Sequence, residues 1–290
     1  MISGRPSRVL PLLAVLLLPG CETLSSLTPW TGRSDDLRAR ERDIAANRPP
    51  EELYNNGVDA LNQRRLATAV AQFDAVEQNY PYSSWAVNAQ LMRGYTEYLQ
   101  NRYTESIGTL DRFIQLHPAH RDIAYAYYLR ALNHYEQIAD IQRDQKGTEQ
   151  ALAALQEVVN RFPESAYARD ARLKIDLCRD HLAGKEMEIG RWYQNQKLYA
   201  AAINRFQRVI NDYQTTNHTP EALHRLTELY LTLGLVDQAR QTAAVLGHNY
   251  PGSEWYEDSY TTLAANGEVP PVGRPRATGG LLSRTFGSLF

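Results

Sequence analysis

Apolar residues recur at intervals of three and four positions from about Glu51 to Ala265. The first stretch shows the pattern with Leu53, Gly57, Ala60 and Leu61. This spacing places apolar side chains on one face of a helix. No alternating run rich in Val, Ile and Thr competes for a strand. The pattern therefore predicts an all-α body whose helices each bury one face.

The apolar pattern also repeats along the chain. Counted from the small residue Gly57, the residues Ala69, Phe73, Val76 and Pro81 stand at offsets 12, 16, 19 and 24. Five copies of this pattern begin at Gly57, Gly94, Ala131, Gly190 and Thr227. The repeat length is 37 residues, the distance from Pro81 to Pro118, and the third copy carries eight extra residues around 140–147. Five copies at consistent offsets predict a repeat architecture.

Each repeated position has a physical reason. Small residues at offsets 0 and 12 allow two helices to approach closely, and large residues at 16 and 19 are expected to fill the space against the next repeat. Proline ends the second helix because it has no N–H to donate. These spacings are typical of the tetratricopeptide repeat. We expect an α-solenoid of about five helix pairs that form a right-handed superhelix.

The repeats define the domain boundaries. We expect a tetratricopeptide-repeat domain at 49–265, with front repeats at 49–164, a linking helix at 165–184 and rear repeats at 185–265. Cys178 falls in the linking helix, where a lone thiol is usually a small buried apolar group. Residues 266–290 combine Pro, Gly and Arg and are expected to be a disordered basic tail.

The N-terminus reads as a secretory signal at 1–20, with Arg5 and Arg8 before an apolar run. The sequence Leu18-Pro19-Gly20-Cys21 resembles a bacterial lipobox, although Pro19 departs from the usual small residue. That resemblance implies N-acyl and S-diacylglycerol lipid on Cys21, with residues 21–48 as a flexible tether. Residue 22 is Glu, so we expect anchoring at the periplasmic face of the outer membrane.

Composition and motifs exclude several function classes. The formal charge of −2 gives no basic footprint for nucleic acid. Phosphate-binding loops, nucleophile elbows and zinc-protease motifs are missing from the sequence, so we expect no enzyme and no cofactor besides the lipid. His117 and His120 straddle Pro118 and are expected to lie in a solvent-facing turn rather than in a metal site.

The concave face of such repeats is built from first-helix positions, and in this chain its front part is aromatic. The predicted peptide-binding groove contains Tyr54, Tyr95, Tyr98, Tyr125, Tyr128 and Tyr135. Tyrosine gives broad apolar contact and a hydroxyl at low entropic cost, which suits an extended peptide bearing aromatic residues. About half of these rings are expected to be accessible, with the others packed between helices. The rear positions are polar and include Met187, Arg191, Glu221, His224 and Glu228.

The lipobox, the tether and the repeats together resemble the BamD (ComL) family of the outer-membrane β-barrel assembly (Bam) machinery, over about residues 10–262. The sequences 111–118, 128–132 and Asn204-Arg205 carry the resemblance in the repeats. It implies a non-enzymatic lipoprotein that binds the POTRA domains of BamA through its rear repeats, near Arg205. It also implies BamC-like and BamE-like partners, and front repeats that recognise the aromatic-ended C-terminal strand of unfolded outer-membrane proteins.

A second interpretation remains open at this point. Lipoproteins with these repeats also serve as periplasmic adaptors for peptidoglycan hydrolases or the Tol-Pal system. The repeat pattern fits both kinds of protein, and the proteins bound by the mature chain would distinguish them.

Overall fold

The computed structural model describes residues 48–268, and within this range it contains eleven helices and no strand. The helices are α2 (Pro50–Asn62), α3 (Leu66–Asn79), α4 (Ser84–Leu99), α5 (Tyr103–Leu116), α6 (Ile123–Tyr135), α7 (Lys146–Arg161), α8 (Ala166–Asn195), α9 (Tyr199–Asp212), α10 (Thr219–Thr232), α11 (Val236–Asn249) and α12 (Glu254–Ala265). The signal peptide, Cys21 and nearly all of the tether lie outside the described residues, as does the chain from 269 onward.

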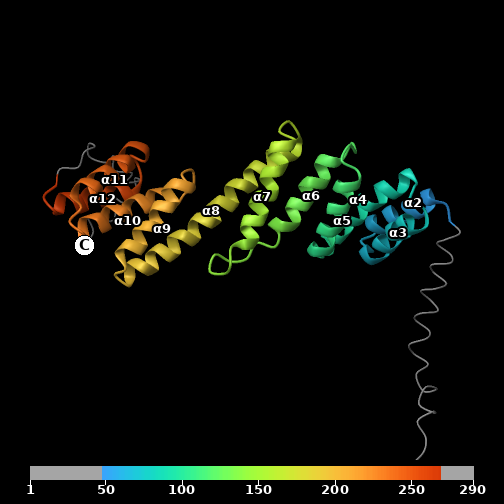
Figure 1. The fold of residues 1–290 in the computed structure, drawn as a ribbon, viewed down its shortest axis with the longest axis horizontal. Coiled ribbons are helices and arrows are strands. Elements are labelled where there is room, and N and C mark those ends of the chain that lie inside the picture. The colour runs from blue at the N-terminus through green and yellow to red at the C-terminus, as the bar shows by residue number, and fades with distance from the viewer. Residues whose placement is uncertain (1–47, 269–290) are drawn as a thin grey trace, which may run out of the picture. The chain divides into compact units, whose positions relative to one another are not determined.

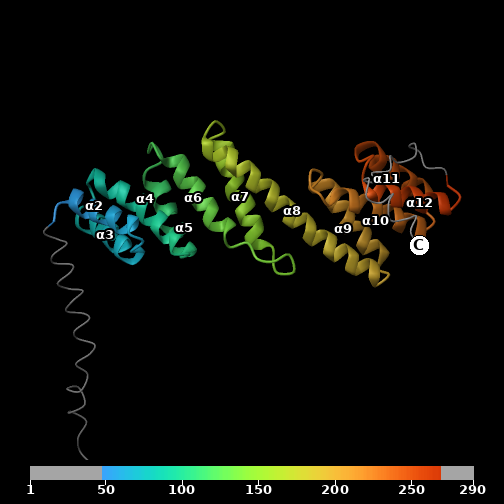
Figure 2. The ribbon, with the colours of Figure 1, turned by 180° about the vertical axis from the view of Figure 1, so that it is seen from behind.

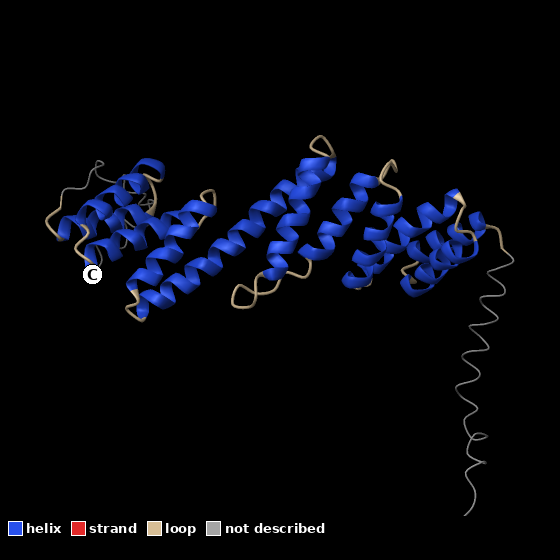
Figure 3. Ribbon diagram, in the orientation of Figure 1, coloured by secondary structure: helices blue, strands red, loops and turns tan. Residues whose placement is uncertain are grey.

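The helices pack in the order of the chain, each against the next (Figures 1 and 2). Five pairs result, from α2/α3 to α10/α11, and α12 packs on the last pair. The first helices of successive pairs also touch: α2 contacts α4, and α4 contacts α6. Loops connect the helices, and the longest of them lies between α6 and α7 (Figure 3). The predicted all-α solenoid of tetratricopeptide-like helix pairs is therefore confirmed.

The glycine at the origin of three repeats permits contact with the large residue at offset 16 of the same repeat. A Cβ at Gly57 would lie 2.6 Å from Cε1 of Phe73, and one at Gly190 would lie 2.5 Å from Cε1 of Phe206. Both phenylalanines are fully buried. The side chain at offset 16 packs on its own first helix and also reaches the next repeat, since Leu110 of α5 clusters with Ala126 and Leu129 of α6. Offset 19 reaches the next repeat as well, since Phe113 of α5 clusters with residues of α6.

The turns between repeats have a recurring chemistry. Four second helices end in the same way, with a C-cap residue that is followed directly by a proline. These helices are α3, α5, α7 and α11. Three of the following helices have a serine N-cap, Ser83, Ser165 and Ser253, whose hydroxyl accepts a backbone N–H of the first turn. These serines belong to the Pro-x-Ser sequences that follow the second helices, so one short segment ends one helix and begins the next.

The predicted boundary between a linking helix and the fourth repeat was wrong. Residues 166–195 form one continuous helix of 30 residues, α8. Gly184, where the linking helix was expected to end, lies buried inside it. A Cβ there would lie 3.0 Å from Ile141 and 3.1 Å from Nε2 of His218. The glycine therefore serves the close approach of two loops and does not break the helix.

One of these two loops, between α6 and α7, contains the eight inserted residues of the third repeat. The α6–α7 loop crosses to the middle of α8, where the His181 ring bonds the Ala139 carbonyl at 2.9 Å and Lys185 Nζ donates to the Gln142 carbonyl at 3.1 Å. From the loop between α9 and α10, the backbone N–H of Asn217 donates to Asp180 Oδ1 at 3.2 Å. Both loops thus support α8 where the front repeats meet the rear ones.

Cys178 also lies on α8, and its side chain is buried in the cluster formed with α6 and α7. Burial raises the pKa of the thiol to about 11, which keeps it protonated. The prediction of a structural, apolar cysteine is confirmed.

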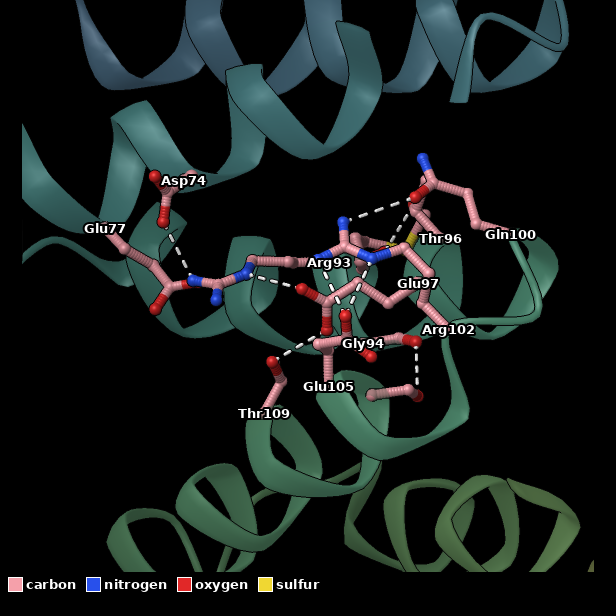
Figure 4. Close-up of polar contacts among 12 residues, drawn as sticks. Asp74, Glu77, Arg93, Gly94, Thr96, Glu97, Gln100, Arg102, Glu105 and Thr109 are labelled. Atoms are coloured by element: carbon pink, nitrogen blue, oxygen red, sulfur yellow. Dashed lines mark hydrogen bonds and ion pairs between the residues drawn. The ribbon is translucent and has the colours of Figure 1, made fainter. Parts of the chain in front are cut away.

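A partly buried ionic network joins the first two helix pairs (Figure 4). Arg93 of α4 contacts Asp74 of α3 through Nη1 at 2.8 Å and Glu97 through Nε at 3.1 Å. Thr109 of α5 donates its hydroxyl to the other Glu97 oxygen at 2.8 Å. The pattern recurs one repeat later, where Arg130 contacts Asp111 at 3.0 Å. Because Glu97 is only 3% exposed, these hydrogen bonds satisfy a carboxylate that would otherwise be costly to bury.

Candidate functional site

The structure brings five of the six predicted groove tyrosines together on α4 and α6, and adds one from α8. Tyr95 contacts Tyr125 with ring centroids 6.5 Å apart, Tyr125 contacts Tyr167 at 5.5 Å, and Tyr167 stacks on Tyr128 at 5.3 Å. Tyr98 and Tyr135 pack against the same two core clusters. We call Tyr95, Tyr98, Tyr125, Tyr128, Tyr135 and Tyr167 the tyrosine surface. All six are partly exposed, so the rings are both packed and accessible.

Acidic side chains fix the hydroxyl groups of this surface. Tyr98 donates to Glu136 at 3.2 Å, and Tyr128 donates to Asp170 in a short hydrogen bond. Burial, then the neighbouring carboxylate, raises the pKa of Tyr98 to about 12. Burial first, and then the bond to Asp170, raises the pKa of Tyr128 as well. These phenols therefore stay neutral at physiological pH and act as donors.

Tyr54 makes its ring contacts elsewhere, with Phe73 at 5.7 Å and Trp85 at 5.1 Å. The Trp85 contact belongs to a repeated junction. A ring three residues before the repeat origin meets an aromatic ring two residues after the next N-cap serine. The three instances are Tyr54 with Trp85, Tyr128 with Tyr167 at 5.3 Å, and His224 with Trp255 at 5.4 Å. The groove tyrosines thus help to join successive repeats.

Tyr167 was missed by the sequence reasoning, although a signal for it exists. It stands in Pro163-Glu164-Ser165-Ala166-Tyr167, which matches the spacing that places Trp85 after Pro81 and Trp255 after Pro251. Offsets counted within single repeats do not reveal this residue, because it acts across the junction between two repeats.

The rear first-helix positions form ionic contacts. Arg191 of α8 contacts Glu221 of α10 at 3.0 Å, and Arg225 contacts Glu228 at 2.9 Å. His224 is buried and bonds the Ser259 hydroxyl at 2.8 Å. Met187, which the repeat positions placed on the rear surface, is fully buried in the rear core. The prediction of a polar rear surface therefore holds for the charged positions and was wrong for Met187 and His224, which are both buried.

Arg205, the residue that the family resemblance assigns to partner contact, lies on α9. Its Nη1 contacts Glu186 of α8 at 3.0 Å, and the hydrogen bond to Glu186 raises its pKa. Arg208 contacts the other Glu186 oxygen at 3.0 Å. Two arginines therefore share one carboxylate on this surface. The Arg205 side chain remains 34% exposed and is accessible from solvent.

The two histidines beside Pro118 are held by ring packing. His117 and His120 both pack their rings on Phe113, with centroids 5.5 and 5.2 Å away. Between residues 48 and 268, we find no group of three or more His, Cys, Asp or Glu side chains placed to hold a metal ion. None of the helices in that range is long and apolar enough to cross a bilayer.

Comparison with known proteins connects this fold to a family. The family model for an outer membrane lipoprotein, YfiO, matches residues 46–246. The outer membrane protein assembly factor BamD of Caulobacter vibrioides is 53% identical over 229 residues, which cover 79% of this chain and 75% of the relative. The BamD of Rickettsia prowazekii is 46% identical over 218 residues, covering 75% and 86%.

The similarity extends to more distant relatives. BamD of Neisseria meningitidis serogroup A is 34% identical over 213 residues, covering 70% of this chain and 80% of its own. The matched region includes the tyrosine surface and Arg205. The chain belongs to the YfiO family of outer membrane lipoproteins, the BamD family of outer membrane protein assembly factors.

Proposed function

We propose that this chain is a non-enzymatic, lipid-anchored subunit of the Bam machinery. It binds unfolded outer-membrane proteins on the tyrosine surface and presents them to the barrel-forming subunit BamA. The observation that carries the proposal is the continuous tyrosine surface over α4, α6 and α8 in a member of an assembly-factor family.

The tyrosine surface has the chemistry for an extended, aromatic-rich strand. Ring edges and faces accept aromatic side chains by offset or edge-to-face contact, and each such pair of rings contributes about 0.5–1.5 kcal/mol beyond burial. Because neighbouring repeats already hold the rings, little side-chain entropy is lost on binding. Such contacts recognise a class of sequences rather than one sequence, as an assembly factor for many substrates requires.

In this proposal the rear repeats bind the partner protein BamA. Glu186 is held by both Arg205 and Arg208 at 3.0 Å. Arg205 can therefore turn to a carboxylate of a BamA POTRA domain while Arg208 keeps Glu186 paired. Since BamC-like and BamE-like lipoproteins belong to the same machinery, they are the further partners of this chain.

The membrane anchor is the lipid on Cys21, which holds the chain at the periplasmic face of the outer membrane. Buried acyl chains contribute about 0.8 kcal/mol per CH₂, so several chains retain a protein stably. Replacing Cys21 with Ala should leave an unprocessed or released protein in cell fractionation. A processed and membrane-bound Cys21→Ala protein would refute the anchor.

Site-specific photo-crosslinking tests the binding surface. A photoreactive residue at Tyr95 or Tyr128 should capture the C-terminal strand of a nascent outer-membrane protein. Matched positions on second helices, Gln78 of α3 and Gln115 of α5, are exposed and should stay unlabelled. Labelling from these control positions alone would reject the tyrosine surface as the binding site.

Pulldown of the mature protein tests the assignment to the Bam machinery. We expect recovery of a barrel protein with POTRA domains. Recovery of peptidoglycan hydrolases or Tol-Pal components in its place would favour the adaptor interpretation. An Arg205→Glu variant should lose the POTRA partner and keep substrate crosslinking at Tyr128.

A further inference from the structure

Four of the five helix pairs turn in the same way between their two helices. Seven residues after the repeat origin the backbone adopts a left-handed φ, at Arg64 (59°), Asn101 (59°), Lys197 (61°) and Gly234 (72°). The next residue donates its backbone N–H to the carbonyl five residues earlier, at 2.8 Å from Arg65, 3.0 Å from Arg102, 3.0 Å from Leu198 and 2.8 Å from Leu235. Because the four turns share one backbone conformation, the differences between them lie in their side chains.

The two rear turns differ from the front ones because they expose apolar side chains. Arginine follows the left-handed residue in the first two pairs, whereas leucine follows it in the rear pairs, as Leu198 and Leu235. These leucines are 51% and 40% exposed. Leu233, in the same turn as Leu235, is 45% exposed, and Trp192 in the last turn of α8 is 56% exposed. Four large apolar side chains therefore reach solvent around two equivalent turns.

These two turns lie on one edge of the rear repeats. Figure 1 shows the α8–α9 turn and the α9–α10 turn at opposite ends of α9. Since α9 packs on α10 and α10 packs on α11, the chain returns to the first edge at the α10–α11 turn. We call Trp192, Leu198, Leu233 and Leu235 the apolar edge. Single exposed leucines are ordinary on a protein surface, but a group of them on one edge is typical of an interaction site.

Basic groups accompany the apolar edge. Lys197 is exposed and directly precedes Leu198, and Arg64 and Arg65 are exposed in the equivalent turn of the first pair. Asp237 of α11 is an exposed acidic residue beside the edge. Leucine and tryptophan next to lysine and arginine are the side chains that favour the boundary between lipid headgroups and acyl chains. The composition of this edge therefore fits a lipid surface that carries anionic headgroups.

The lipid anchor of the proposed function would hold this edge near a bilayer. From Cys21 to Arg48, the first described residue, the chain advances 27 residues (48 minus 21). A fully extended chain covers about 3.3–3.6 Å per residue, so the fold would remain within roughly 90–100 Å of the membrane. Tethering at this distance gives the bilayer a high effective concentration at the apolar edge.

We propose that the apolar edge rests on the periplasmic surface of the outer membrane, with Trp192 and the three leucines among the upper acyl chains and Lys197 at the headgroups. This inference rests on the proposed lipid anchor and adds to it a second, reversible contact with the lipid. The contact fixes which edge of the rear repeats faces the membrane, and an anchor on Cys21 alone does not.

A fluorophore on the apolar edge tests the contact in the full-length, lipidated protein, reconstituted into vesicles of equal parts phosphatidylethanolamine and phosphatidylglycerol. Leu198→Cys is labelled with the environment-sensitive dye NBD. The label is selective, because Cys178 is buried and Cys21 carries lipid under the proposed function. We expect the NBD emission at 198 to shift to the blue in vesicles and to be quenched by lipids with brominated acyl chains. Adding Leu235→Asp should abolish this quenching, because a carboxylate is costly to move into an apolar phase.

The matched control is Leu116→Cys, labelled in the same way. Leu116 is 61% exposed and ends α5, at the edge opposite to the α4–α5 turn. Its label should stay unquenched, and Leu116→Asp should leave the quenching at 198 unchanged.

Flotation of the protein with the vesicles separates the contact from the anchor. Protein that floats without quenching at 198, or with equal quenching at 198 and 116, would refute the apolar edge alone. Protein that does not float would refute the lipid anchor, and the inference would fail with it. A label at 198 that is shielded only after BamA is added would assign the edge to a protein partner and overturn the lipid contact.

Discussion

Replacing Gly190 with Ala tests the packing rule that builds the repeats. The new Cβ would lie 2.5 Å from Cε1 of Phe206 and 2.9 Å from Cδ1 and Cζ, closer than real contacts allow. Overpacking a core costs about 1–3 kcal/mol, and a contact this close to a fully buried ring belongs near the upper value. Alanine recovers about 1 kcal/mol of helix propensity. We therefore expect a net loss of about 2 kcal/mol in the free energy of unfolding.

The matched control is Gly108→Ala on α5, where an added Cβ meets nothing within 4 Å. This change should gain helix propensity alone and stabilise by about 0.5–1 kcal/mol. Thermal unfolding followed by circular dichroism should show a lower Tm for Gly190→Ala, by about 4–8 °C, and a higher one for Gly108→Ala. Adding Phe206→Leu to Gly190→Ala should restore part of the loss, as Gly94 pairs with Leu110 in the second repeat. A Gly190→Ala protein as stable as the parent would refute the packing rule.

Three further experiments test local features of the structure. Cys178 should react with iodoacetamide at pH 8 about a hundredfold more slowly than an ordinary thiol, because its pKa is about 11 instead of 9.0; rapid native alkylation, measured by mass spectrometry, would contradict its burial. For Glu228, burial raises the pKa, but hydrogen bonds from His224 and Arg225 outweigh it and lower the pKa from 4.5 to about 2. The ionised Glu228 therefore stabilises the fold above about pH 4.5, and this stabilisation is lost as the pH falls towards 2. Glu228→Gln should lower the free energy of unfolding by roughly 1–2 kcal/mol at pH 7 and weaken its dependence on pH between 4.5 and 2. Lys197 has a left-handed φ of 61°, so Lys197→Gly should stabilise by about 0.5–1 kcal/mol in urea unfolding; a destabilised variant would show that the turn carries no strain.

The repeats could be predicted from sequence because their cores are local. Gly57 and Phe73, or Gly190 and Phe206, are separated by one helical hairpin, so a fixed offset in the sequence corresponds to one contact in space. The six groove tyrosines followed from the same offsets, and five of them share one surface in the structure.

Features that depend on contacts between repeats escaped prediction. Gly184 resembles a helix end in sequence, but its role is set by Ile141 and His218, which come from two distant loops. The place of Tyr167 likewise depends on how one repeat meets the next. Periodicity within a repeat carries no information on such contacts, whereas the Pro-x-Ser-x-aromatic spacing does.

The affinity of the tyrosine surface for a substrate strand tests the central claim most directly. A fluorescent peptide from the C-terminal strand of an outer-membrane β-barrel protein is titrated against the parent protein, Tyr167→Ala and Trp255→Ala. Tyr167 and Trp255 occupy equivalent junctions between repeats. Tyr167→Ala removes the ring contacts with Tyr125 and Tyr128, and Trp255→Ala removes the ring contact with His224, but only Tyr167 belongs to the tyrosine surface. Loss of one aromatic contact should weaken binding by about tenfold in Tyr167→Ala and leave Trp255→Ala unchanged. Equal affinities for all three proteins, or weaker binding in Trp255→Ala alone, would contradict substrate recognition by this surface.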